Sequence, residues 1–184
     1  MKIGLIGEAP FDTVALENLL SQKYFDNIEY VTLLKDVTGS NLDNAKMIKF
    51  ARRQYEKHKP NFIIYFRDLD ALKSDREKIL YRKEWFNKMN SMLDKKCILL
   101  LFIFEIEALL FADIETTNNF YNTNVVDNRI PEEIHNAKEE AYKLFKINGV
   151  DIELFSKFNL QNLENNYSIL KEFFIQFEQK LNTN

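Results

Sequence analysis

Hydrophobic positions follow two periods along the first 104 residues. Short apolar runs predict strands at 2–7, 27–34, 61–67 and 96–104. Helical spacing of apolar residues predicts helices at 11–24, about 41–57 and 74–93. Strands that alternate with helices at these lengths form parallel βαβ units, with helices on both faces of a central sheet. The predicted fold class is therefore α/β, a Rossmann-like three-layer sandwich with a mainly parallel sheet.

Two local signals refine these elements. The runs 61–67 and 96–104 are almost continuously apolar, which is typical of strands buried on both faces. Ser74 and Glu77 have the spacing of a capping box, in which a serine begins a helix and a glutamate three residues later bonds back to it. We therefore expect the third helix to begin at Ser74.

The last 80 residues have a different pattern, with helical periodicity and no further strand. Helices are predicted at 106–111, 131–145 and 166–181, and an Asn- and Thr-rich loop at 114–129. The five phenylalanines between positions 155 and 177 are expected to pack in the core. The 184 residues suit one domain, with an α/β core at 1–104 and a mainly helical C-terminal cap at 105–184.

Composition excludes several classes of protein. A single cysteine, Cys97, cannot form an internal disulfide or a cysteine zinc cage. The chain has no signal-peptide pattern at its start and no apolar run approaching the roughly 18 residues of a membrane span, so we expect a cytoplasmic protein without a membrane partner. Charge is uneven: residues 1–104 carry 18 Lys and Arg against 14 Asp and Glu, and residues 105–184 carry 7 against 14. Any nucleic-acid face should lie in the first half.

Acidic residues follow three of the predicted strands. Glu8 follows the first strand, Asp68 and Asp70 the third, and Glu105 and Glu107 the fourth. Ligands of open parallel sheets bind beyond the carboxyl ends of the strands, and grouped carboxylates favour a hard cation such as Mg²⁺. In an extended segment Asp68 and Asp70 would face the same side. Glu8 joins them only if the first strand lies beside the third.

Four segments carry a resemblance to a known family. Residues 7–12 (GEAPFD) and 67–70 (RDLD) resemble the TOPRIM domain of topoisomerases, primases and OLD-family nucleases. Residues 104–113 (FEIEALLFAD) and 131–136 (PEEIHN) are similar to a compact TOPRIM-related family of uncharacterised bacterial proteins. The resemblance matches Glu8 to the TOPRIM glutamate, Asp68 and Asp70 to its acidic pair, and Glu107 to a glutamate of the compact family. TOPRIM glutamates usually precede glycine, whereas Ala9 and Pro10 follow here.

The resemblance implies a metal-dependent, nuclease-like enzyme that cleaves phosphodiester bonds, in a bacterial defence or DNA-processing system. Mg²⁺ or Mn²⁺ would be held by Glu8, Asp68, Asp70 and Glu107. Glu8, Asp68 and Asp70 would be catalytic together with Lys73, and Lys73 and Arg67 would contact phosphate. DNA is favoured over RNA as the substrate. The chain lacks a glycine-rich phosphate loop with lysine, so an ATPase partner would be a separate chain.

Other interpretations of the same residues stay open. Acids after strands commonly cap helices or form turns, and lysines on helices commonly face solvent. A non-catalytic binding or regulatory subunit with the same fold is the main alternative, which the Ala9-Pro10 departure favours. A receiver-like phosphoacceptor domain ranks lower, because the first strand supplies Glu8 without a second acid. A dehalogenase-type phosphatase is rejected, because its acidic pair follows the first strand.

Overall fold

The centre of the fold is a four-stranded sheet with every strand parallel to its neighbours. The computed structural model describes residues 1–8, 10–24 and 26–183. Its strands are β1 (Lys2–Ile6), β2 (Glu29–Thr32), β3 (Phe62–Asp68) and β4 (Cys97–Phe102). Their order is β2-β1-β3-β4, so β1 lies beside β3 as the candidate site requires. The α/β prediction is confirmed.

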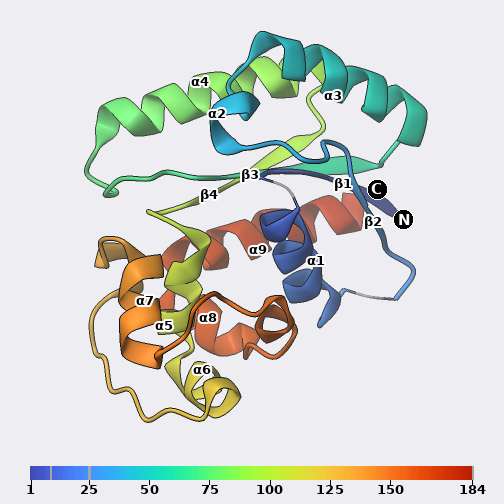
Figure 1. Cartoon of the computed structure of the whole chain (residues 1–184). Coiled ribbons are helices and arrows are strands. Elements are labelled where there is room, and N and C mark those ends of the chain that lie inside the picture. Colours follow the sequence, from blue (N-terminus) through green and yellow to red (C-terminus); the bar gives the residue numbers. More distant parts are fainter. Residues whose placement is uncertain (9, 25, 184) are drawn as a thin grey trace.

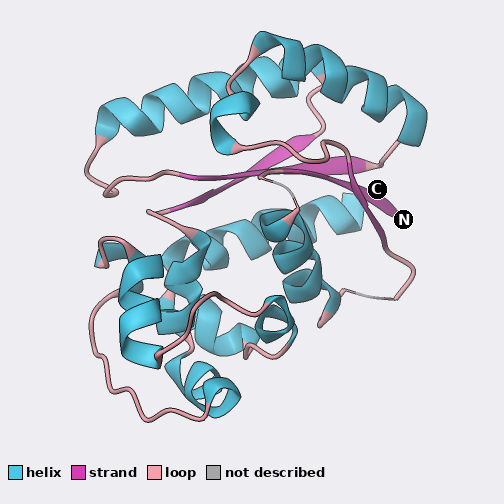
Figure 2. Ribbon diagram, viewed as in Figure 1, coloured by secondary structure: helices cyan, strands magenta, loops and turns pink. Residues whose placement is uncertain are grey.

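Helices cover both faces of this sheet (Figure 1). α2 (Gly39–Leu42), α3 (Ala45–His58) and α4 (Arg76–Met92) cover one face. α1 (Phe11–Ser21) and α9 (Ser168–Thr183) lie against the other (Figure 2). The result is a three-layer, Rossmann-like arrangement in which the sheet is the middle layer.

Alternation along β3 assigns its side chains to the two faces. Phe62, Ile64 and Phe66 belong to the hydrophobic cluster that contains α1 and the C-terminal helices. Ile63 and Tyr65 belong to the cluster formed with α3 and α4. All five are at most 1 % exposed, which confirms a strand buried on both faces.

After β4, the described residues form helices joined by loops and no strand, as predicted for the C-terminal cap. Its elements are η1 (Ile106–Ala108), α5 (Leu109–Ala112), α6 (Ile114–Tyr121), η2 (Pro131–Glu133), α7 (Ala137–Phe145), η3 (Ile152–Ser156) and α8 (Leu160–Asn166). Phe155, Phe158, Phe173, Phe174 and Phe177 are all buried, so the phenylalanine-rich tail packs in the core as expected. Cys97 is also buried.

Two local predictions are wrong. The segment predicted as a loop at 114–129 begins with helix α6, because Asp113 caps its start and the buried Thr117 hydroxyl donates to the Leu110 carbonyl at 2.8 Å. Helix α4 begins at Arg76, and its N-cap is Asp75, whose carboxylate accepts from the Lys78 amide at 3.0 Å. The Ser74 capping box does not form, because the neighbouring aspartate takes the capping position.

Within the residues that the structure describes, no helix is both long enough and apolar enough to cross a membrane.

Candidate functional site

The carboxyl ends of β1, β3 and β4 meet at one edge of the sheet, and acidic residues gather there. Ile6 pairs with Tyr65 in the β1–β3 ladder, and Asp68 pairs with Phe102 in the β3–β4 ladder. The loops that leave these three strands therefore start side by side. This topology places Glu8, Asp68 and Glu107 at the same edge, as the sequence predicted.

A cluster of four carboxylates, Glu8, Asp12, Asp68 and Glu107, forms around the end of β3; we call it the acidic cluster. Asp68 lies on the face of β3 that α1 covers, because it is in phase with Phe66. Asp12 comes from the first turn of α1, and Glu107 from the 3₁₀ helix that follows β4. Glu107 is 7 % exposed, so this acid is removed from most solvent.

Burial and the charges of neighbouring acids raise the pKa values of Asp12, Asp68 and Glu107. Loss of solvent, followed by the charges of Glu8 and Glu107, raises the pKa of Asp12 from 3.8 to about 7. Loss of solvent raises the pKa of Asp68 well above its ordinary value, and repulsion by Asp12, Glu107 and Glu8 adds to it. Burial also raises the pKa of Glu107. The cluster therefore retains protons near neutral pH unless positive charge replaces them.

Lys138 supplies positive charge at the rim of the acidic cluster. Its ammonium lies 3.8 Å from Oε1 of Glu107, and its backbone amide donates to Oε2 of Glu105 at 3.1 Å. Glu107 raises the pKa of Lys138, consistent with an attractive contact. The two contacts attach the first turn of α7 to the end of β4.

On the opposite face of the sheet, arginines and aspartates form an ion-pair network. Arg67 is the neighbour of Asp68 in β3 and therefore points to the α3 and α4 side. Its Nη1 donates to Oδ1 of Asp43 at 2.9 Å. Arg82 of α4 donates through Nη1 to Oδ2 of Asp43 at 2.5 Å and through Nη2 to Oδ2 of Asp70 at 2.7 Å. Asp43 thus bridges two buried guanidinium groups.

The expectation that Asp68 and Asp70 face the same side is wrong. β3 ends at Asp68, and Asp70 takes a left-handed backbone conformation with φ of 51°. Alternation applies only to extended backbone, so it does not carry past the end of the strand. The Asp70 carboxylate pairs with Arg82, whereas Asp68 stays among the acids of the other face.

Lys73 is not brought to the acids. It is exposed, and its ammonium donates to the Ser168 hydroxyl at the start of α9 at 3.3 Å. Lys78, on the first turn of α4, lies closer to the site, because its ammonium donates to the Asp70 carbonyl at 2.9 Å. The structure therefore does not bring Lys73 to the acids, and Lys78 is the lysine that lies beside Asp70.

A cavity of about 610 Å³ opens between the end of β3, α2 and α4; we call it the β3–α4 cavity. Its walls include Glu8, Asp70 and Lys78, together with Arg67 and Arg82. The Glu8 carboxylate lies so close to Gly39 that a Cβ at that position would overlap it. Glu8 therefore belongs to the wall of the cavity and also repels Asp68, which makes it the link between the two faces.

The carboxylates of the acidic cluster suit a divalent cation, both because their oxygen atoms are suitable ligands and because they are acidic. Carboxylate oxygens are the ligands that Mg²⁺ and Mn²⁺ prefer, and the raised pKa of Asp68 reports charge that a cation would neutralise. Across residues 1–8, 10–24 and 26–183, no three Asp, Glu, His or Cys side chains already form a metal-binding group. Binding would thus require the carboxylates to turn toward a common point.

The Ala9-Pro10 departure falls partly outside the described residues, since Ala9 is not among them. Pro10 is the N-cap residue of α1, and its carbonyl accepts from the Thr13 hydroxyl at 2.9 Å. The proline thus begins the helix that carries Asp12 into the acidic cluster.

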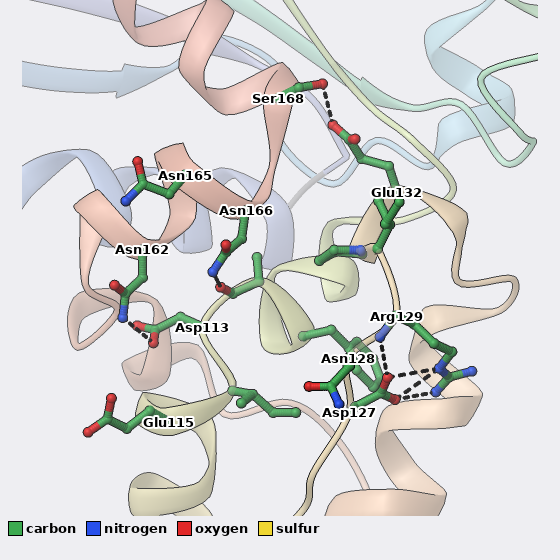
Figure 3. A pocket seen from close by; sticks show the side chains of 15 residues that line it. Asp113, Glu115, Asp127, Asn128, Arg129, Glu132, Asn162, Asn165, Asn166 and Ser168 are labelled. Carbon is green, nitrogen blue, oxygen red and sulfur yellow. Dashed lines mark hydrogen bonds and ion pairs between the residues drawn. The ribbon is translucent and has the colours of Figure 1, made fainter.

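A second cavity, of about 680 Å³, lies in the C-terminal cap between the start of α6, residues 127–132 and α8 (Figure 3). Its polar groups bond to one another. Asp113 accepts from the Asn159 amide at 2.7 Å and from Nδ2 of Asn162 at 3.0 Å, and Glu132 accepts from the Ser168 hydroxyl at 2.6 Å. These contacts hold the cap together, and we place the candidate site at the sheet edge instead.

Sequence reasoning did not assign four residues of the site. Asp12 could have been predicted from the sequence, because it lies four residues after Glu8 in the same strand-to-helix segment. Asp43, Arg82 and Lys138 had none, because each reaches the site from a helix or loop whose placement depends on tertiary packing.

Comparisons with protein-family models, with curated proteins and with solved structures found no match.

Proposed function

We propose that this protein is a divalent-cation-dependent enzyme that cleaves phosphodiester bonds at the acidic cluster. The observation that carries the proposal is the position of Asp68, a partly buried acid that four neighbouring acids repel: Asp12, Glu107, Glu8 and Asp70. Such an arrangement costs free energy in a protein that needs only to fold, because each buried carboxylate must keep a proton or repel its neighbours. A bound cation would remove that cost.

Asp68 and Glu8 would hold the cation, with Asp12 or Glu107 completing the set. When bound, Mg²⁺ or Mn²⁺ would supply Lewis-acid stabilisation of charge on phosphoryl oxygens. Without a cation the pKa of Asp12 is raised to about 7, so Asp12 would release its proton near neutral pH as the cation binds. Lys138 would keep Glu107 oriented through their ion pair.

Nucleic acid, DNA before RNA, is the substrate that this proposal favours. The support is the resemblance to TOPRIM nucleases and the exposed cations of α3 and α4, which include Lys46, Lys49, Arg53, Lys83 and Lys88. Cations in such positions contact the phosphate backbone without reading sequence. A defence or DNA-processing role with a separate ATPase chain is part of the same proposal.

One observation favours the second candidate function, a non-catalytic binding or regulatory subunit. Asp70 is held by Arg82 at 2.7 Å, and no three donors in the described part of the chain are already grouped around a metal position. If that arrangement persists, the fold would present its surface to a partner without cleaving a substrate.

Titration calorimetry with Mn²⁺ separates the two functions. The wild type should bind Mn²⁺ at near-stoichiometric occupancy, and Asp68→Asn should abolish binding. Glu115→Gln, which alters an exposed carboxylate of α6, is the matched control and should bind as the wild type does. The wild type and Glu115→Gln should nick supercoiled DNA, and Asp68→Asn should not. Equal Mn²⁺ binding by wild type and Asp68→Asn would refute the metal site, and stoichiometric binding without cleavage would favour the regulatory subunit.

A further inference from the structure

The β3–α4 cavity contains cationic groups whose hydrogen bonds are incomplete. Arg67 is 2 % exposed and Arg82 is 8 % exposed. Among the described residues, the Nε–H groups of these two arginines are the buried side-chain polar atoms that lack a hydrogen-bond partner. A buried donor without an acceptor costs about 1–3 kcal/mol, and both arginines line the β3–α4 cavity.

The walls of the cavity add further donors. The Lys78 ammonium bonds to a backbone carbonyl, that of Asp70, and forms no ion pair within the described chain. The hydroxyls of Thr38 and Ser40 also line the cavity. Guanidinium, ammonium and hydroxyl donors that converge on one space are suited to an oxyanion, because its several oxygens accept from all of them.

Three carboxylates, those of Glu8, Asp43 and Asp70, also line that space. Asp43 and Asp70 both pair with Arg82, but the Asp43 side chain is 10 % exposed and the Asp70 side chain is 54 % exposed. An exposed ion pair contributes little to stability, because solvent competes for both partners. Asp70 is therefore the partner of Arg82 that another anion can replace.

We propose that the β3–α4 cavity binds a phosphate group on Arg82, Lys78 and Arg67, in place of the Asp70 carboxylate. The inference rests on the proposed function and deepens it, since it locates the phosphate of the substrate beside the acidic cluster. Glu8 stands in the wall between the phosphate and Asp68.

Displacement of Asp70 has a consequence for the cation. Once released from Arg82, the Asp70 carboxylate is free to add to the charge around Asp68, which it already influences. Phosphate and Mn²⁺ would then bind with positive coupling, and each would raise the affinity of the other by the same factor.

Calorimetry with inorganic phosphate, in EDTA and at fixed ionic strength, tests the site without any metal. Asp70→Asn removes the competing charge and should bind phosphate about tenfold more tightly than the wild type, since loss of one ion-pair interaction of modest strength changes affinity by roughly that factor. Lys78→Met and Arg82→Met should bind at least about fivefold more weakly. Lys157→Met removes an exposed lysine at the end of η3, in the C-terminal cap, and should leave phosphate affinity unchanged.

Two further arms identify the source of the phosphate. Hexathymidylate with a 5′-phosphate is compared with the unphosphorylated hexamer, so that a terminal phosphate is distinguished from an internal diester. A preference for either hexamer supports the phosphate site if Lys78→Met abolishes that preference. Circular dichroism checks that Arg82→Met folds, and Lys78→Met keeps the test decisive if it does not.

The proposal is overturned if Asp70→Asn and the wild type bind phosphate equally, if Lys157→Met loses as much affinity as Lys78→Met, or if no protein binds. Because EDTA is present throughout, phosphate binding that depends on Lys78 would stand even if Mn²⁺ failed to bind at Asp68. Conversely, Mn²⁺ binding without phosphate binding would retain the metal site and remove this inference.

Discussion

Stability should fall as the pH rises from about 4 to about 7, because Asp12 keeps its proton in the folded protein over this range. Its pKa is about 7 in the fold against an ordinary value of 3.8. Below about pH 4 the carboxyl is protonated in both states and has no effect. As the pH rises toward 7, the unfolded chain releases its proton first, so the folded state loses stability. Above pH 7 the loss is complete.

The magnitude follows from the difference between the two pKa values. At 1.36 kcal/mol for each pH unit, this difference corresponds to a destabilisation on the order of 4 kcal/mol. A chain of this size changes its Tm by about 2–4 °C for each kcal/mol, so the contribution of Asp12 is roughly 8–16 °C. Asp68 and Glu107 act in the same direction, because their pKa values are also raised.

Urea unfolding at pH 5 and pH 8 measures the effect directly in EDTA. Asp12→Asn should lose much less stability than the wild type over this interval, since it removes both the titration of Asp12 and its repulsion of Asp68. Asp26→Asn, at an exposed acid before β2, is the control and should follow the wild type. Identical pH dependence in wild type and Asp12→Asn would show that Asp12 is not forced to keep its proton. Addition of Mn²⁺ at pH 8 should restore much of the lost wild-type stability.

Three further substitutions test separate parts of the structure. Gly39→Ala places a methyl group where the Glu8 carboxylate lies, so calorimetry should show Mn²⁺ binding weakened roughly fivefold to tenfold with the fold intact by circular dichroism. Unchanged Mn²⁺ affinity would place Glu8 outside the metal site. Tyr167→Phe removes the hydroxyl that accepts from the buried Ile103 amide at 2.8 Å and should lower the free energy of unfolding in urea by about 1–3 kcal/mol. Asp113→Ala leaves several donors of the C-terminal cap without an acceptor and should cost about 2–4 kcal/mol in the same assay; a loss below 1 kcal/mol would contradict its role.

The fold was largely predictable because the hydrophobic pattern determines it. Continuous apolar runs predicted β3 and β4. Residues 62–66 of β3 are buried on both faces, whereas Leu99 and Leu101 of the edge strand β4 are only partly buried. Helix α6 was missed because its sequence is rich in Asn and Thr, and such residues form helices only where tertiary contacts support them. The buried hydrogen bond of Thr117 is one of those contacts.

The site was predictable only where it depends on the ends of strands. Glu8, Asp68 and Glu107 follow from the rule that ligands bind beyond the carboxyl ends of parallel strands. Asp70 and Lys73 did not behave as expected, because both lie beyond β3, where the left-handed conformation of Asp70 redirects the chain. A sequence pattern does not indicate where such a turn occurs when the residue is not glycine.

The adjacency of Arg67 and Asp68 explains why cations and acids coexist at this edge without neutralising each other. Consecutive residues of a strand point to opposite faces, so one residue supplies the arginine network beside α4 and the next supplies the acidic cluster beside α1. On the α4 face the two arginines are paired with Asp43 and Asp70, and Glu8 is the carboxylate that reaches both faces. A phosphodiester needs a cation at one oxygen and hydrogen-bond donors at the others. In the proposed function, the acidic cluster would hold the cation on one face of the strand end, and the arginines would supply the donors on the other face. Both groups would then contact one phosphate that spans the sheet edge.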